Sequence, residues 1–193
     1  MRLFLVVRHG QSLFNLDKVV NGDPTLDRGL SEQGIEDAER LAGQLAGLRL
    51  DLVVVSPFPR AIQTANIALA GREVPHLVDE DLGDVRIGDL EGESLAAYRQ
   101  EPAHSDRKEP FPGGESLDEA ALRYAGAFER LLARDEPATL VACHEIPLRY
   151  LVNAAAGSDE LNGPLTSVAN ATPYLFDEPA LRRAIERMRE LAG

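Results

Sequence analysis

Four side chains of two kinds, arginine and histidine, are placed where they can act together on one chemical group. Arg8 and His9 follow an apolar run, Arg60 comes shortly after a second run, and His144 follows a third. Two guanidinium groups and two imidazoles suit a phosphoryl group, because arginine presents paired donors to its oxygens and stays charged. A neutral imidazole is also a competent nucleophile near neutral pH. The residue types therefore favour phosphoryl binding and transfer.

The three apolar runs that precede these side chains indicate strands. Residues 3–7, 51–55 and 138–142 are largely apolar without alternation, which is typical of strands covered on both faces. Segments with helical spacing or helix-start signals separate the runs. Strands alternating with helices predict an α/β fold with a mostly parallel sheet, in which ligands bind beyond the carboxyl ends of the strands. We therefore expect the four side chains to converge at one edge of the sheet.

The remaining segments are predicted from caps, periodicity and turn residues. Ser31 and Ser116 are expected to cap helices, the second through a capping box with Glu119. Residues 16–30 are expected to form a loop, and residues 93–112 an excursion without clear periodicity that covers the site. Short strands are expected at 74–78, 165–169 and 172–176, and further helices from Pro59, from Pro147 and over 179–191.

Composition and charge exclude several classes of protein. The 193 residues fit one domain, and 32 acidic against 20 basic residues give a formal net charge of −12. This charge repels nucleic-acid backbones and anionic membranes, so neither is an expected partner, and any anion site must be a local basic pocket. The single cysteine cannot form an internal disulfide, and no apolar run is long enough to span a bilayer. A cytoplasmic location is expected, with a homodimer as one option for the assembly.

No rival catalytic motif is present in the sequence. It has no Walker loop, no nucleotide-binding glycine fingerprint, no Gly-x-Ser-x-Gly elbow and no HExxH helix. The other two histidines, His76 and His104, stand in polar surroundings and are expected to be exposed. Two histidines with a carboxylate can hold zinc, but neighbouring arginines oppose cation binding. We therefore expect no metal and no other cofactor.

The chain resembles the histidine phosphatase, or phosphoglycerate mutase-like, superfamily over essentially its whole length. The matching motifs, in family order, are Arg8-His9-Gly10-Gln11-Ser12 with Asn15; Leu30-Ser31-Glu32-Gln33-Gly34; Ser56-Pro57 with Arg60-Ala61-Ile62-Gln63-Thr64-Ala65; Gly88-Asp89-Leu90-Glu91-Gly92; Gly113-Gly114-Glu115-Ser116; and His144. The resemblance implies a three-layer α/β/α fold with a mostly parallel central sheet. It also implies a single domain over 1–193, with a short substrate-covering excursion at 93–112, and a covalent phosphohistidine mechanism without metal.

The resemblance also implies roles for individual residues. His9 is the nucleophile that attacks phosphorus, Arg8, Arg60 and His144 hold the phosphoryl oxygens, and Asn15 assists from the loop. These roles are physically reasonable, because a phosphomonoester carries about −1.5 to −2 charges, which two arginines and a protonated His144 offset. Phosphoryl transfer relies mostly on positioning and charge stabilisation, which a rigid basic pocket supplies.

The sequence departs from the family pattern at the proton donor. The family has a glutamate four residues before the first glycine of its Gly-x-x-x-Gly element, and Asp84 stands there, on a side chain one methylene shorter. Glu145 directly follows His144, where this branch usually has glycine, and is similar to the acidic donor of the acid phosphatase branch. The alternative for Glu145 is a favourable charge at a helix N-terminus. Asp84 is the first choice as donor and Glu145 the second.

A further departure concerns the substrate. Val19 stands where mutases commonly have arginine, and the family's long basic substrate segment is reduced to Arg107 and Lys108, which we expect to set specificity. We therefore expect a metal-independent phosphomonoesterase acting on a small phosphorylated metabolite. A phosphoglycerate mutase is the first alternative, opposed by the short excursion, which gives little cover from water. A non-catalytic phosphate-binding module is the second, opposed by the presence of His9 and His144.

Overall fold

One five-stranded sheet organises residues 2–193, the part of the chain that the computed structural model describes. Its strands are β1 (Leu3–Arg8), β2 (Leu52–Val55), β3 (His76–Val78), β4 (Ala138–Cys143) and β5 (Pro173–Asp177). In space they follow the order β3-β2-β4-β1-β5. The first four run parallel to one another, and β5 pairs with β1 in the antiparallel direction. The predicted mostly parallel sheet is therefore confirmed.

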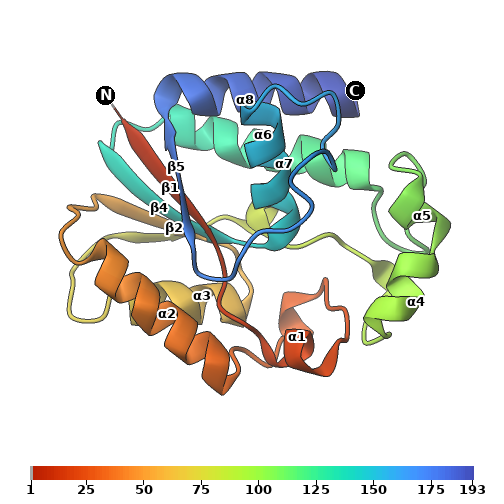
Figure 1. Ribbon diagram of the computed structural model, residues 1–193, viewed down its shortest axis with the longest axis horizontal. Helices are drawn as coiled ribbons and strands as arrows, with labels where there is room; N and C mark the ends of the chain where they lie inside the picture. The colour runs from red at the N-terminus through yellow and green to blue at the C-terminus, as the bar shows by residue number, and fades with distance from the viewer. Residues whose placement is uncertain (1) are drawn as a thin grey trace.

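Helices cover both faces of the sheet and complete the predicted three layers (Figure 1). One face carries α2 and α3, and the other carries α6, α7 and α8. Their bounds are α2 (Glu32–Leu45), α3 (Pro59–Ala68), α6 (Leu117–Leu132), α7 (Glu145–Ala155) and α8 (Glu178–Ala192). Along β1, Phe4 and Val6 pack toward α6–α8, whereas Leu5 and Val7 pack toward α2 and α3. The strands are apolar throughout because both of their faces are buried.

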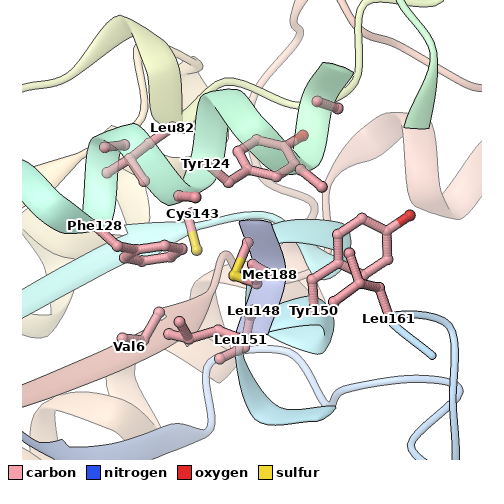
Figure 2. Packing of buried hydrophobic residues seen from close by; sticks show 14 of the residues in the cluster. Val6, Leu82, Tyr124, Phe128, Cys143, Leu148, Tyr150, Leu151, Leu161 and Met188 are labelled. Atoms are coloured by element: carbon pink, nitrogen blue, oxygen red, sulfur yellow. The ribbon is translucent and has the colours of Figure 1, made fainter. Parts of the chain in front are cut away.

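The larger core lies between the sheet and α6, α7 and α8 (Figure 2). Tyr124 and Phe128 of α6 lie opposite Leu148 and Leu151 of α7, with Met188 of α8 between them, and all five are fully buried. Close packing of this kind leaves little room for rearrangement. The core therefore gives α7, whose N-terminus belongs to the candidate site, a rigid support.

Short helices occupy segments where the sequence predicted irregular chain. In α1 (Leu13–Asp17), the capping residue Ser12 forms a capping box with Asn15. The segment predicted as a loop, 16–30, contains the end of α1 and one 3₁₀ turn, and the excursion contains two short helices that lie beyond the main body of the sheet (Figure 1). The remaining elements are η1 (Pro24–Leu26), η2 (Glu80–Leu82), η3 (Gly88–Leu90), α4 (Leu95–Gln100) and α5 (Pro102–Ser105). No helix within residues 2–193 has both the length and the apolarity to cross a membrane.

The predicted strand at 165–169 is wrong, because side chains of α7 take up the backbone groups that a strand would pair. The Nδ2 group of Asn153 donates to the carbonyl oxygens of Leu161 and Leu165, at 2.9 Å each, and its Oδ1 accepts from the Leu165 N–H at 3.0 Å. Arg149 donates to the carbonyl oxygen of Thr166 at 2.8 Å. The segment is thereby held against α7. The other predicted strands and helices are confirmed, with small shifts at their ends.

Candidate active site

The carboxyl ends of β1, β4 and β2 bring the four predicted side chains together. The register of β1 against β4 pairs Arg8 with Cys143, and the N–H of His9 donates to the Cys143 carbonyl at 2.9 Å. His9 and His144 therefore leave adjacent strands side by side, with ring centroids 5.2 Å apart. Arg60 lies in the first turn of α3, directly after β2, the other neighbour of β4. The expected convergence at one edge of the sheet is confirmed.

The imidazole of His9 is buried and has a defined tautomer. Its Nδ1 lies 2.7 Å from the carbonyl oxygen of Gly10, which can only accept, so Nδ1 carries the hydrogen and Nε2 carries the lone pair. Gly10 is required there, since a β-carbon would lie 2.4 Å from the carbonyl oxygen of Gly34. Burial lowers the pKa of His9 well below its ordinary value, and the nearby charges, led by Arg60, lower it further. His9 is therefore neutral at neutral pH, with Nε2 available as a nucleophile.

The guanidinium group of Arg60 contacts several other residues of the site. Its Nε donates to Nε2 of His9 at 3.2 Å, and its Nη2 lies 3.0 Å from Oδ2 of Asp84. Its Nη1 donates to Oδ1 of Asn21 at 2.7 Å, and its backbone N–H donates to Oδ2 of Asp27 at 2.9 Å. Only 4% of the side chain is exposed. Arg60 is thus fixed in position by neighbours on two loops.

The completely buried His144 pairs with Asp84, whose side chain is 26% exposed, and both residues contact Arg60. Nδ1 of His144 lies 3.3 Å from Oδ2 of Asp84, and its Nε2 lies 2.7 Å from Oγ of Ser56. Burial is the main reason that the pKa of His144 is lowered, although Asp84 opposes this, so the structure does not favour the protonated His144 expected from the sequence. Burial alone would raise the pKa of Asp84, but its contact with His144 and the positive charge of Arg60 hold it below its usual value. Asp84 is therefore ionised in this arrangement.

Arg8 and Glu145 form a second ion pair, and both side chains line the same cavity as His9. Nη1 of Arg8 lies 2.7 Å from Oε2 of Glu145 and donates to the carbonyl oxygen of Val168 at 2.9 Å. The buried Nε of Arg8 has no hydrogen-bond partner within residues 2–193. Asn15 is held by its capping box, in which Oδ1 accepts from the Ser12 N–H at 3.2 Å. Each of the two arginines therefore forms an ion pair with one candidate proton donor, Arg60 with Asp84 and Arg8 with Glu145.

A cavity of about 770 Å³ opens over these side chains. Most of the predicted site residues line it, namely Arg8, His9, Asn15, Arg60, Asp84 and Glu145. His144 stands behind the wall, completely buried, where its Nδ1 faces Asp84 and Arg60. Such a volume is in the range of pockets that hold whole small molecules and is far larger than a phosphoryl group needs. The rest of the cavity is therefore available for the organic part of a ligand.

Arg107 and Lys108, which the sequence predicts to set specificity, lie outside the wall of the cavity. Arg107 is paired with Asp118 at 2.7 Å and donates to the hydroxyl of Tyr150 at 2.8 Å, and Lys108 is exposed. Neither lines the cavity. The prediction that His104 is exposed is wrong, because its side chain is partly buried and lines the cavity. His76 is exposed as predicted.

Three residues that hold the site together were not predicted from the sequence to have a role in it. Asn21 and Asp27 fix Arg60, and Ser56 contacts His144. Asn21 and Asp27 stand in the segment predicted as a loop, and their polarity was consistent with turn residues alone. Ser56 belongs to a matched motif, and its place directly after a buried strand was the one available signal.

Comparison with protein families gives an independent result. Residues 4–190 match the family model described as histidine phosphatase superfamily (branch 1). Among the curated relatives, a protein of Brucella melitensis biotype 2 named 2,3-bisphosphoglycerate-dependent phosphoglycerate mutase is 34% identical over 172 residues, which cover 81% of this chain and 82% of the relative.

Solved structures with a similar fold carry other names. Bacillus stearothermophilus YhfR is 27% identical, with a TM-score of 0.81, over 92% of this chain and 91% of that one. The alpha-ribazole phosphatase from Shigella flexneri is 25% identical, with a TM-score of 0.79, over 91% and 90% of the two chains. The mycobacterial glucosyl-3-phosphoglycerate phosphatase Rv2419c, in complex with VO3, is 26% identical, with a TM-score of 0.75, over 91% and 92%.

Proposed function

This chain belongs to branch 1 of the histidine phosphatase superfamily, and on that premise we propose that it is a metal-independent phosphomonoesterase that acts on a small phosphorylated metabolite through a phosphohistidine intermediate. One observation carries the proposal: Nε2 of the buried, neutral His9 faces the guanidinium of Arg60 in a cavity that Arg8 also lines. A nucleophilic lone pair beside two fixed cations is the arrangement that phosphoryl transfer requires.

The first step forms a P–N bond and breaks a P–O bond. Nε2 of His9 attacks phosphorus with its lone pair, and the leaving alcohol oxygen takes a proton from a carboxylic acid. Arg8 and Arg60 balance the charge of the phosphoryl oxygens, which total about −1.5 to −2 in the substrate. A dianion beside His144 also raises the pKa of that imidazole, which restores the positive form and adds a third cation.

The second step is hydrolysis of the phosphohistidine. Water attacks phosphorus, the P–N bond breaks, and His9 recovers its lone pair while the water proton passes to the carboxylate that acted as the acid. Asp84 is our first choice for this group because its Oδ2 contacts both Arg60 and His144. A phosphoryl group that draws these two cations toward itself raises the pKa of Asp84 and allows it to carry a proton. Glu145, paired with Arg8, is the second choice.

A phosphoglycerate mutase is the alternative, favoured by the names of the curated relatives. A mutase must hold its intermediate away from water during transfer and return. Here Asn15, Lys18 and Arg99 line the cavity and are exposed, so water reaches its mouth. The names of several similar structures also favour a phosphatase.

We retain from the sequence a single domain, a small phosphorylated partner and a cytoplasmic location.

Two assays test the proposal. Turnover of p-nitrophenyl phosphate in the presence of EDTA is expected, with inhibition by vanadate, which resembles a five-coordinate phosphorus. Loss of turnover with EDTA and recovery with zinc would contradict the metal-independent mechanism, and absence of any turnover would favour a binding module. With 3-phosphoglycerate, release of inorganic phosphate is expected. Formation of the phosphoglycerate isomer without phosphate release would establish the mutase instead.

A further inference from the structure

The segment that carries Asp84 has no regular secondary structure of its own. Residues 83–87 run irregularly between η2 and η3. The side chains of Val85 and Ile87 are buried in the larger core, whereas Asp84 lines the cavity. Buried main-chain polar groups in such a segment must find hydrogen-bond partners elsewhere in the chain. The place of Asp84 therefore depends on those partners.

Arg123 of α6 binds three carbonyl oxygens of this part of the chain. Its Nη1 donates to the carbonyl oxygens of Asp81 at 2.8 Å and Gly83 at 3.0 Å, and its Nη2 donates to that of Asp84 at 3.1 Å. Only 9% of the Arg123 side chain is exposed. The next residue of α6, Tyr124, is fully buried in the larger core. The main chain of Asp84 is thereby bonded to a rigidly packed helix.

Glu115 holds the same segment on the other side of Asp84. Its Oε1 accepts from the N–H of Arg86 at 3.0 Å, and its own N–H donates to the carbonyl oxygen of Arg86 at 2.8 Å. Gly114 permits this close contact, because a β-carbon there would lie 2.1 Å from the same carbonyl oxygen. Nε of Arg123 donates to Oε2 of Glu115 at 3.1 Å, and Nη2 of Arg123 is paired with Oε1. The two side chains therefore form one unit that contacts the main chain before, at and after Asp84.

The geometry of this unit requires arginine at position 123. Each of the five N–H groups of the guanidinium has an acceptor, either a carbonyl oxygen of the segment or the carboxylate of Glu115. Lysine has three donors on a single nitrogen and cannot form this planar set. Because Glu115 balances the charge of Arg123, the unit supplies orientation and little net charge.

Aspartate makes the dependence on the main chain strict. Its side chain has one rotatable bond fewer than that of glutamate, so Oδ2 of Asp84 closely follows the backbone of its own residue. This oxygen lies 3.0 Å from Nη2 of Arg60 and 3.3 Å from Nδ1 of His144. Arg60 is also held by Asn21 and Asp27. A shift of the segment would therefore displace the carboxylate and leave Arg60 in place.

We propose that Arg123, together with Glu115, is a positioning residue for the proton donor Asp84 and acts on the reaction through the placement of that carboxylate. This inference deepens the proposed function and rests on it for the reaction and for Asp84 as the donor. Protonation of the leaving oxygen should depend on Arg123, whereas binding of the phosphoryl group by Arg8 and Arg60 should not.

Arg123→Lys, which keeps the charge and removes the planar set of donors, tests the proposal. Its kcat/KM would be compared for n-butyl phosphate, whose leaving group needs a proton, and p-nitrophenyl phosphate, whose leaving group does not. The alkyl-to-aryl ratio is expected to fall about 10- to 100-fold, because a displacement of about 1 Å in the site can cost up to that much. The inhibition constant of inorganic phosphate is expected to stay at the parent value.

A double-mutant cycle separates positioning from a general loss of structure. Asp84→Asn lowers the ratio by itself if Asp84 is the donor. In that background Arg123→Lys should lower the ratio no further, because two changes that act through one group are not additive. An equal further fall would overturn the proposal, and so would an unchanged ratio in Asp84→Asn alone.

Glu115→Gln gives a second variant should Arg123→Lys fail to fold. Glutamine keeps an acceptor for the N–H of Arg86 but loses the ion pair with Arg123, so the ratio should fall in the same direction and by less. A parent ratio in every folded variant of the pair would overturn the proposal. Equal losses for both substrates with weaker inhibition by phosphate would do the same. Turnover of p-nitrophenyl phosphate would leave the phosphatase activity standing in either case.

Two arginines outside the site serve as matched controls. Arg130 lies on the same helix as Arg123 but forms half-exposed ion pairs with the side chains of Asp79 and Asp81. Arg183 is an exposed residue of α8 that does not line the cavity. Arg130→Lys and Arg183→Lys are both expected to keep the parent alkyl-to-aryl ratio.

Discussion

Nε of Arg60 donates a hydrogen bond to Nε2 of His9 across 3.2 Å, while Nη2 of the same guanidinium lies 3.0 Å from Oδ2 of Asp84. One side chain therefore connects the proposed nucleophile to the first-choice proton donor. The arginine charge helps to keep His9 neutral and Asp84 ionised. It also stands where the oxygens of a phosphoryl group must go when Nε2 approaches phosphorus.

Replacing Arg60 by lysine should lower kcat/KM for p-nitrophenyl phosphate by roughly 10²–10³, the usual cost of losing a fixed donor to a developing anion. Lysine keeps the charge but cannot present a planar fork to several partners at once. Steady-state kinetics would be measured beside Arg183→Lys, which should retain the parent value. Equal activity of Arg60→Lys and the parent would show that only the charge of Arg60 matters.

Asp27 should contribute to stability through its contact with Arg60. Its side chain is completely buried and accepts from the backbone N–H groups of Arg60 and Gly29. Asp27→Ala should lower the free energy of unfolding by about 3 kcal/mol, the lower end of the range for breaking a buried pair, because Asp84 still balances part of the Arg60 charge.

Urea unfolding would measure this difference against a surface control. Asp17 pairs with Arg28 while both side chains are about half exposed, so Asp17→Ala should cost less than about 1 kcal/mol. Similar losses for the two variants would mean that the contact between Asp27 and Arg60 does not matter for folding.

The sequence was enough to predict that four side chains lie close together, namely Arg8, His9, Arg60 and His144. The prediction depends only on the apolar runs that precede these residues. Each buried strand is marked by its own apolar run, and parallel neighbours must end at the same edge of the sheet. The supports of Arg60 could not be predicted in this way. Asn21 and Asp27 reach Arg60 only through the path of a long loop, which no periodicity records.

The orientation of the Arg107 side chain is a second feature that could not be predicted from the sequence. This side chain contacts Asp118 of α6 and Tyr150 of α7, so its orientation depends on tertiary packing. By contrast, Arg149 has a recognisable signal, since it stands four residues after Glu145 and three after Ile146 on one helix face. That spacing places it in the cavity once the start of α7 is known to belong to the site.

The lowered pKa of His9 predicts a specific pH dependence. A lowered pKa means that the imidazole takes up a proton only at a pH below its ordinary value of 6.5, so the nucleophile stays neutral through the neutral range. NMR titration of the His9 ring, assigned with the His9→Asn variant, should show its transition below that pH. Arg60→Gln should move the transition upward, because one of the neighbouring charges is removed. A His9 transition above 6.5 would contradict the account.

The two candidate proton donors can be separated by the leaving group. An alkoxide needs a proton during P–O cleavage, whereas a phenolate leaves adequately without one. Asp84→Asn should therefore slow alkyl phosphates by roughly 10²–10⁴ and affect aryl phosphates much less in the cleavage step. Glu145→Gln, equally close in shape, should have a smaller effect on both. The reverse pattern would assign the proton donor to Glu145.

In the proposed mechanism, His9 carries the phosphoryl group between the two steps. The protein would be mixed with excess substrate, quenched rapidly in alkaline denaturant, digested and examined by mass spectrometry. Phosphate is expected on the peptide that contains His9. It should be lost on brief exposure to acid and be missing from the His9→Ala variant, which should have no turnover. Phosphate trapped on another residue, or full turnover by His9→Ala, would contradict this mechanism.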